Sequence, residues 1–186
     1  GKICVADKPK ADAKRVIAEL KNGGTKVIML TGDNESAAKP VAEELGIDEY
    51  SAGLLPQDKL SRVDELIKNK KKNDVVAFVG DGINDAPVLM RSDVGVSMGQ
   101  VGSDSAIEAS DVVLMHDRLS DIPLAKRIAK KTMRIVRENV VFSLAIKFGV
   151  LILSAVGLAN MWLAVFADVG VAVLAVLNAM RALKIK

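Results

Sequence analysis

Two aspartates, Asp81 and Asp85, follow directly after the apolar run VVAFV at residues 75–79. A short apolar run bounded by turn residues is typical of a buried strand, and carboxylates at its end would lie at the edge of a sheet. Mg²⁺ prefers oxygen ligands and leaves some positions to water or phosphate. Gly80 and Gly82 permit a sharp bend and the close approach of a ligand. We therefore predict that Asp81 and Asp85 form a Mg²⁺ site.

Two further segments carry groups that could bind a phosphoryl oxygen. The sequence TGD follows the apolar run KVIML, so the Thr31 hydroxyl and the Gly32 backbone N–H could donate hydrogen bonds to it. Lys59, in PQDK near the expected start of a helix, could offset its negative charge. Ligands of parallel α/β sheets bind beyond the carboxyl ends of the strands. We expect these groups to meet Asp81 and Asp85 there.

The elements that must position these residues alternate between strand-like and helical patterns. This alternation predicts an α/β fold with a Rossmann-like parallel sheet that is covered on both faces. Pro40 should kink or delay the second helix. The expected strands are 2–6, 26–30, 50–53, 75–79, 94–98 and 111–115, and the expected helices among them are 9–24, 35–46 and 56–73.

The composition changes after residue 120. A basic amphipathic helix is followed by two apolar runs, 140–157 and 161–180, and each is roughly long enough to cross a bilayer. Basic residues flank the outer ends of the runs but not the turn, so both ends should be cytoplasmic. We predict three parts: an α/β domain at 1–120, a juxtamembrane helix at 121–139 against anionic lipid, and an α-helical transmembrane hairpin with a basic tail at 140–186.

Lys147 and Asp168 are charged residues inside the two apolar runs. Counted from a turn near residues 158–159, they lie at depths of ~17 and ~14 Å at 1.5 Å per residue. They would share a level near the bilayer centre, where a charge is costly and marks a functional hypothesis. Asp168 could be an ion ligand with Lys147 as its counter-charge, or the two could form a structural ion pair that locks the hairpin.

The order TGDN, PQDK and VGDGINDAP resembles the haloacid dehalogenase superfamily, and specifically the P-type ATPases, over the whole chain. The resemblance implies that residues 1–120 are the second part of a phosphorylation domain that works through an aspartyl phosphate. It also implies site roles for individual residues. Thr31 and Gly32 contact the phosphate, Asp33 supports that loop, Lys59 stabilises the phosphoryl group, Asp81 ligates Mg²⁺, and Asn84 and Asp85 support the metal–phosphate cluster.

One departure concerns the nucleophile, because the family's D-K-T-G-T motif is absent from this chain. The nearest string is VADKPK, in which Asp7 follows a strand but Pro9 and Lys10 replace the phosphate-loop residues. We therefore expect a C-terminal fragment of a longer pump. The nucleophilic aspartate, the nucleotide-binding and actuator domains and the earlier membrane helices would lie upstream. ATP would be bound mainly by that missing part, and the fragment alone would be inactive.

The cargo is suggested by the polar residues of the hairpin. Asn139, the seven-residue gap to Lys147, and the sequence Asp168-Val-Gly170 resemble the terminal helices of pumps that export Zn²⁺, Cd²⁺ or Pb²⁺. Copper exporters would instead show Met and Ser ligands, and cobalt is the next candidate. The softer thiolate ligands would come from upstream. The resemblance implies an integral protein of a bacterial plasma membrane, with residues 1–139 and the C-terminus in the cytoplasm.

Composition limits the alternatives. The net charge of +3 is too small to indicate nucleic-acid binding. A membrane-anchored, Mg²⁺-dependent phosphatase of the same superfamily would need its own nucleophile, for which only Asp7 is available. A non-catalytic hairpin protein that binds a partner pump would explain the missing nucleophile but not the aspartate cluster.

Overall fold

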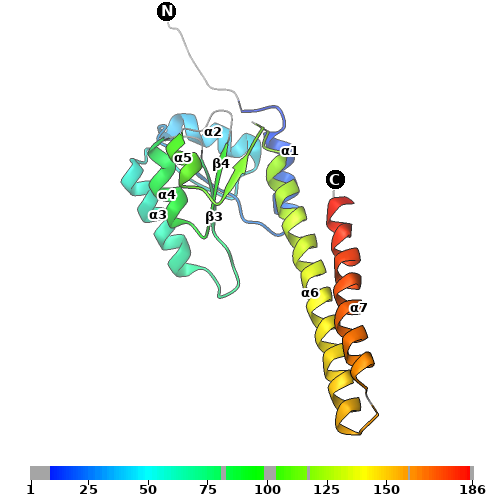
Figure 1. Cartoon of the computed structure of the whole chain (residues 1–186). Coiled ribbons are helices and arrows are strands. Elements are labelled where there is room, and N and C mark those ends of the chain that lie inside the picture. Colours follow the sequence, from blue (N-terminus) through cyan, green and yellow to red (C-terminus); the bar gives the residue numbers. More distant parts are fainter. Residues whose placement is uncertain (1–8, 81–82, 99–103, 117, 159, 185–186) are drawn as a thin grey trace, which may run out of the picture. The chain divides into compact units, whose positions relative to one another are not determined.

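The computed structural model describes residues 9–80, 83–98, 104–116, 118–158 and 160–184. The chain divides into two compact units, Gly1–Pro123 and Leu124–Lys186. The expected strand at 2–6 lies outside the described residues. Figure 1 shows the course of the chain through both units.

The first unit alternates strands and helices along the chain, as the sequence patterns predicted. The predicted helix around Pro40 forms, and that proline lies inside it. Three short elements, η1, α4 and α5, were not predicted, because helices of three to six residues are too short to show a helical period. The elements are α1 (Ala13–Asn22), β1 (Ile28–Leu30), α2 (Glu35–Leu45), β2 (Glu49–Ser51), α3 (Pro56–Asn69), β3 (Ala77–Gly80), the 3₁₀ helix η1 (Ile83–Asp85), α4 (Ala86–Arg91), β4 (Val94–Met98), α5 (Asp104–Glu108) and β5 (Val112–Leu114).

All strand pairings in the described residues are parallel, which confirms the predicted α/β class. The strands do not form one continuous sheet, however. β1 pairs with β2, while β3, β4 and β5 form a separate ladder in that order. Within the described residues no strand bridges the two ladders, so the single sheet expected from the sequence is divided.

An aspartate precedes three of these strands and ties each one to its neighbour. In each case the backbone N–H of the aspartate donates to a carbonyl of the adjacent segment. The carboxylate of the same aspartate accepts from a backbone N–H of that segment. The three carboxylate bonds run from Val27 N to Asp48 Oδ2 (3.0 Å), from Val76 N to Asp93 Oδ2 (2.7 Å) and from Gly95 N to Asp111 Oδ2 (2.8 Å). We call these residues the strand-start aspartates, and they fix where each parallel ladder begins.

The core of this unit lies between β4 and its neighbours. Val96, Met98 and Leu114 form a buried cluster, and α4 packs across β3 and β4 through the fully buried Leu89. Gly95 makes this packing possible, because a Cβ there would lie 2.8 Å from the Leu89 carbonyl oxygen. The short helix α4 is thereby packed against β4 and against β3, the strand that precedes Asp85.

The second unit is an antiparallel helical hairpin formed by most of α6 (Asp121–Ala155) and by α7 (Met161–Ala179), with the 3₁₀ helix η2 (Met180–Lys184) after it (Figure 1). The Asn160 side chain caps α7 by accepting from Leu163 N at 2.8 Å. Both helices are long and apolar enough to cross a membrane by length and composition. This agrees with the two apolar runs predicted from the sequence.

Candidate functional site

The loop after β1 is held in one conformation by its own hydrogen bonds. Thr31 Oγ1 donates to Asp33 Oδ2 at 2.9 Å, and Asp33 N donates to Thr31 Oγ1 at 3.1 Å. The neighbouring segment adds backbone bonds, from Leu54 N to Thr31 O at 3.0 Å and from Gly53 N to Asp33 O at 2.6 Å. Gly32 and Asp33 are exposed at the tip of this loop. The Asp33 side chain and backbone therefore both take part in the hydrogen bonds within this loop.

Lys59 is positioned by the start of α3. Pro56 occupies the first turn, where its missing N–H costs nothing, and the Asp58 carboxylate accepts from Leu55 N at 2.9 Å. This side-chain bond satisfies a donor that a helix end would otherwise leave unpaired. Lys59 follows in the same turn, close to the segment that pairs with the Thr31 loop.

Asp85 and Lys59 meet, although they are 26 residues apart in the sequence. Lys59 Nζ lies 2.9 Å from Asp85 Oδ1, and the two side chains are only 19% and 13% exposed. Asp85 ends η1 and precedes α4. A charged hydrogen bond that is mostly shielded from water is stronger and better ordered than an exposed surface pair. The structure therefore joins the turn after β3 to the start of α3.

Gly80, the last residue of β3, makes room for this carboxylate. A Cβ at Gly80 would lie 2.9 Å from both the Asp85 Cβ and Asp85 Oδ2. We had expected this glycine to admit a ligand, and in the structure it admits the Asp85 side chain. The position of the carboxylate therefore depends directly on the absence of a side chain at residue 80.

The remaining residues of the predicted site are only partly described. Asp81, Gly82 and the alternative nucleophile Asp7 lie outside the described residues. Asn84 is described and exposed. Within the described ranges, no three His, Cys, Asp or Glu side chains lie close enough together to hold a metal ion.

The described part of the site suits Mg²⁺ in its donor chemistry. Asp85 offers a hard carboxylate, of which Oδ1 already contacts Lys59 and Oδ2 lies beside Gly80. Mg²⁺ is usually bound by one or two carboxylates, with water and phosphate oxygens completing its shell. A site without a closed cage of protein ligands therefore fits this ion.

The hairpin brings together the two charged residues predicted to share a level. Lys147 Nζ lies 3.1 Å from Asp168 Oδ1, and the pair joins α6 to α7. The side chains are nevertheless 62% and 70% exposed. The hairpin itself does not cover this ion pair, which lies on one flank of two largely apolar helices.

Sequence reasoning missed a second polar group at the open end of the hairpin. Glu138 and Asn139 of α6 contact Asn178 at the end of α7 and Arg181 just after it. Asn139 had been noted only for its spacing from Lys147. The available signal was a polar residue near the open end of each helix, with Asn139 eight residues before Lys147 and Asn178 ten residues after Asp168.

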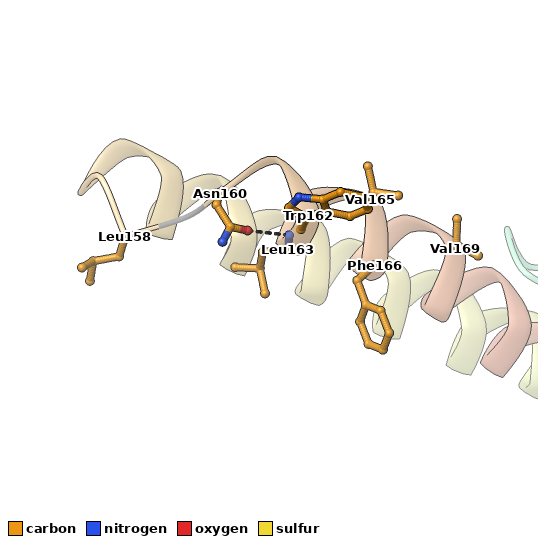
Figure 2. Close-up of a pocket in the computed structure, with 7 residues that line it drawn as sticks. All are labelled: Leu158, Asn160, Trp162, Leu163, Val165, Phe166 and Val169. Carbon is orange, nitrogen blue, oxygen red and sulfur yellow. Dashed lines mark hydrogen bonds between the residues drawn. The ribbon is translucent and has the colours of Figure 1, made fainter.

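An apolar hollow of about 640 Å³ lies at the closed end of the hairpin. Figure 2 shows that its lining comes from the turn and the first turns of α7, with the Asn160 cap at one side. Trp162 and Phe166 are 76% and 78% exposed. No titratable side chain is among the described residues that line this hollow. Trp162 lies at the start of α7, a position typical of an interfacial aromatic anchor.

Comparisons with known proteins identify relatives of both units. A sequence profile of haloacid dehalogenase-like hydrolases matches residues 1–93. The chain is 52% identical, over its whole length, to the cadmium, zinc and cobalt-transporting ATPase of Bacillus subtilis strain 168, of which it covers 27%. It is 50% identical over 99% of its length to the zinc-transporting ATPase of a Synechocystis strain, of which it covers 26%.

A solved structure is similar across both units. The crystal structure of a zinc-transporting PIB-type ATPase in an E2.Pi state matches 96% of this chain with a TM-score of 0.90 and 40% identity, and the match covers 29% of that protein. The chain thus spans about a quarter of the length of the curated relatives that it matches. The resemblance noted from the three sequence motifs and the expected haloacid dehalogenase fold are both confirmed.

Proposed function

Because the chain belongs to the haloacid dehalogenase-like hydrolase family, we propose that it is the part of an ATP-driven divalent metal exporter that supports phosphoryl transfer and contributes one membrane hairpin. The cargo we propose is Zn²⁺, Cd²⁺ or Pb²⁺, with Co²⁺ as the next candidate. The names of the relatives, which include zinc, cadmium and cobalt transporters, support Zn²⁺, Cd²⁺ and Co²⁺. Pb²⁺ is proposed only from the resemblance of the polar residues in the hairpin.

The observation that carries the phosphoryl-transfer part is the shielded contact between Lys59 and Asp85. It holds an ammonium group at the edge where the strands end, and this group can offset the charge that develops on a transferring phosphoryl group. Asp85 keeps the flexible lysine side chain in place. The ordered loop of Thr31 and Gly32 supplies a hydroxyl and a backbone N–H to phosphoryl oxygens, and Asp33 fixes the Thr31 hydroxyl.

We propose that Asp81 and Asp85, supported by Asn84, hold Mg²⁺ against the phosphoryl oxygens. The bound ion would neutralise phosphate charge without a proton transfer. Asp85 could then contact both positive charges of the site, the Lys59 ammonium and the Mg²⁺ ion. Its Oδ1 contacts Lys59, and its Oδ2 does not take part in that contact. The nucleotide base would be bound by other domains, because none of the proposed site residues is suited to it.

The nucleophilic aspartate would come from a segment other than the described residues. The division of the sheet into two ladders supports this idea, because within the described residues the outer strands of each ladder have one edge without a partner strand. Unpaired strand edges present backbone donors and acceptors to an incoming strand. β3 also leaves Val79 40% exposed. We propose that a strand carrying the nucleophile completes the sheet between the two ladders.

In the hairpin, Asp168 would be a ligand of the transported ion and Lys147 its built-in counter-charge. The geometry supports this role because the carboxylate and ammonium lie 3.1 Å apart yet remain exposed on the hairpin flank. A divalent cation that binds Asp168 would compete with Lys147 for the same oxygen. When the ion leaves, Lys147 restores the neutral pair, so that Asp168 does not stand uncompensated in the membrane.

The amino-terminal half of α6 would lie against anionic lipid head groups. Lys130, Lys131, Arg134 and Arg137 are exposed, and none of the four has a carboxylate partner in the part of the chain that the structure describes. Each basic residue near an anionic surface contributes about 1 kcal/mol of attraction. This supports a cytoplasmic location for the unit that precedes the hairpin.

The test uses the complete pump that contains this chain, reconstituted in vesicles. Lys59→Gln should slow the formation of aspartyl phosphate by about 100-fold, because one preorganised charge at a transition state contributes that much to a rate. Asp168→Asn should abolish Zn²⁺ stimulation of ATP hydrolysis but retain aspartyl phosphate formation from inorganic phosphate. Lys71→Gln, a change at an exposed lysine of the same unit, is the matched control for Lys59.

Two results would contradict the proposal in different ways. Normal aspartyl phosphate in Lys59→Gln would remove the phosphoryl role from the Lys59–Asp85 contact. Unchanged Zn²⁺ stimulation in Asp168→Asn would reduce the Lys147–Asp168 pair to a structural contact. Hydrolysis of a phosphate monoester by the isolated chain would instead favour a membrane-anchored phosphatase.

A further inference from the structure

The open end of the hairpin is tied by hydrogen bonds that pass between the two helices. Asn139 Nδ2 on α6 donates to the backbone carbonyl of Ala175 on α7 at 3.1 Å. Asn178 Nδ2 on α7 donates to Asn139 Oδ1 at 2.8 Å. Both contacts are partly buried. The Asn139 amide therefore uses both its donor and its acceptor to hold α7.

Charged side chains extend this network on its exposed side. Arg181 donates to Glu138 Oε2 at 2.9 Å and to Asn178 Oδ1 at 2.7 Å. Asn178 Nδ2 also lies 3.4 Å from Glu138 Oε2. We call Glu138, Asn139, Asn178 and Arg181 the interhelical clasp. Its members come from both helices, so it resists sliding of one helix along the other.

The clasp and the intramembrane ion pair lie at matched spacings on the two helices. Asn139 precedes Lys147 by eight residues, and Ala175 follows Asp168 by seven. At about 1.5 Å per residue these offsets are ~12 and ~10.5 Å. They agree within about one residue. The register that lets Asn139 reach the Ala175 carbonyl is thus the register that sets Lys147 opposite Asp168.

Apolar packing alone defines this register poorly. Outside its few polar residues, α7 consists of Met161 and of Ala, Val, Leu, Gly and aromatic residues. A shift by one turn, about 5.4 Å, therefore places similar side chains against α6. A polar asparagine at a helix interface is the best-attested device for fixing register, because a shifted neighbour leaves its amide unpaired. The clasp supplies two such asparagines in contact.

We propose that Asn139 and Asn178 are positioning residues, which set the register of the hairpin so that Asp168 is presented to the transported cation at a defined depth. Asn139 does not contact the cation, because its amide is engaged in the clasp about 12 Å along the helix from Lys147. The proposal rests on the proposed function of Asp168 as an ion ligand.

The register can be measured without reference to transport. Spin labels at Val141→Cys and Val169→Cys, two exposed sites on different helices, report the distance between them in the complete pump after Cys4→Ser. The signal of a pump without these two cysteines is subtracted as the background from upstream thiols. The parent should give one narrow distance distribution. Asn139→Leu combined with Asn178→Leu should broaden it or shift it by several ångströms, whereas the exposed control Asn69→Leu should not. An unchanged distribution in the double variant overturns the proposal.

The second readout links register to the cargo. Asn139→Leu should raise the Zn²⁺ concentration for half-maximal ATPase stimulation about tenfold, with aspartyl phosphate formation from inorganic phosphate unchanged. Asn139→Gln, which keeps the amide, should recover part of this loss. A shifted register with normal Zn²⁺ dependence overturns the positioning role. If Asp168→Asn also leaves that dependence normal, the proposed function fails as well, while the label distances still decide whether the clasp sets the register.

Discussion

Gly80 is a position in the candidate site where any added side chain would clash with a neighbour. It ends β3 directly beside Asp85, and a Cβ at this position would lie 2.9 Å from two atoms of that side chain. Such a distance cannot be accommodated unless Asp85 moves. Asp85 would then lose its bond with Lys59, and with it the arrangement that we propose holds Lys59 and Mg²⁺ at the phosphoryl group.

We predict that Gly80→Ala in the complete pump lowers aspartyl phosphate formation by about 100-fold, since a displacement of about 1 Å at a reacting centre can cost that much. The measurement is incorporation of labelled phosphate from ATP. Gly149→Ala, at a position where no atom lies within 4 Å of an added Cβ, is the matched control. Equal incorporation in Gly80→Ala and the parent would show that the position of Asp85 is not critical.

The strand-start aspartates act at the scale of secondary-structure elements. The Lys70 ammonium, together with the Val76 N–H, lowers the pKa of Asp93 below its usual value. The Lys21 ammonium and the Val27 N–H do the same for Asp48. A carboxylate with a lowered pKa in the folded state stabilises the fold above the unfolded pKa, about 3.9, and this stabilisation is lost as the pH falls through the folded pKa.

We therefore predict that Asp93→Asn weakens the β3–β4 ladder near neutral pH, and that the difference from the parent shrinks as the pH falls below about 4. Hydrogen exchange at the Val76 and Val94 amides over this pH range measures the local opening. Asp74→Asn, outside the ladders, is the control. A difference that stays constant from neutral to acid pH would contradict the ionic contribution of Asp93.

The same scale shows what the sequence could and could not predict. The strands at 77–80 and 94–98 were predictable because apolar runs are bounded by turn residues there. The convergence of Lys59 and Asp85 followed from the rule that ligands bind at the carboxyl ends of strands. The interhelical clasp was not predicted, because Asn139 and Asn178 are 39 residues apart. The division of the sheet was not predicted either, because hydrophobic periodicity identifies strands but not their neighbours.

At the scale of the whole molecule, the proposed function requires the hairpin to cross a membrane. The ion pair provides a depth marker: if Lys147 and Asp168 lie at mid-bilayer, Arg137 lies ~15 Å from the centre at 1.5 Å per residue. This is the edge of a hydrocarbon core about 30 Å thick. Arg134, Lys131 and Lys130 would then lie at the level of the lipid head groups. The same count brings Leu158 to the opposite surface.

We predict that a cysteine at Leu158, in the turn between α6 and α7, reacts with a membrane-impermeant maleimide added outside intact cells, and that a cysteine at Asn69 reacts only after lysis. Both positions are exposed in the structure, so a difference in labelling reports on the membrane and not on burial. Cys4 is replaced by serine in both variants, and a pump with neither introduced cysteine gives the background labelling of upstream thiols.

The labelling result tests two inferences together: the orientation inferred from the basic residues and the depth inferred from the Lys147–Asp168 pair. If Leu158→Cys is protected and Asn69→Cys reacts in intact cells, the orientation inferred from the basic residues is wrong. If both react only after lysis, the hairpin does not cross the membrane. Asp168 would then lie outside any path across the membrane, and the Lys147–Asp168 pair would have only a structural role. Labelling of the turn alone would place Asp168 within the bilayer, where the proposed ligand of an exported metal has to be.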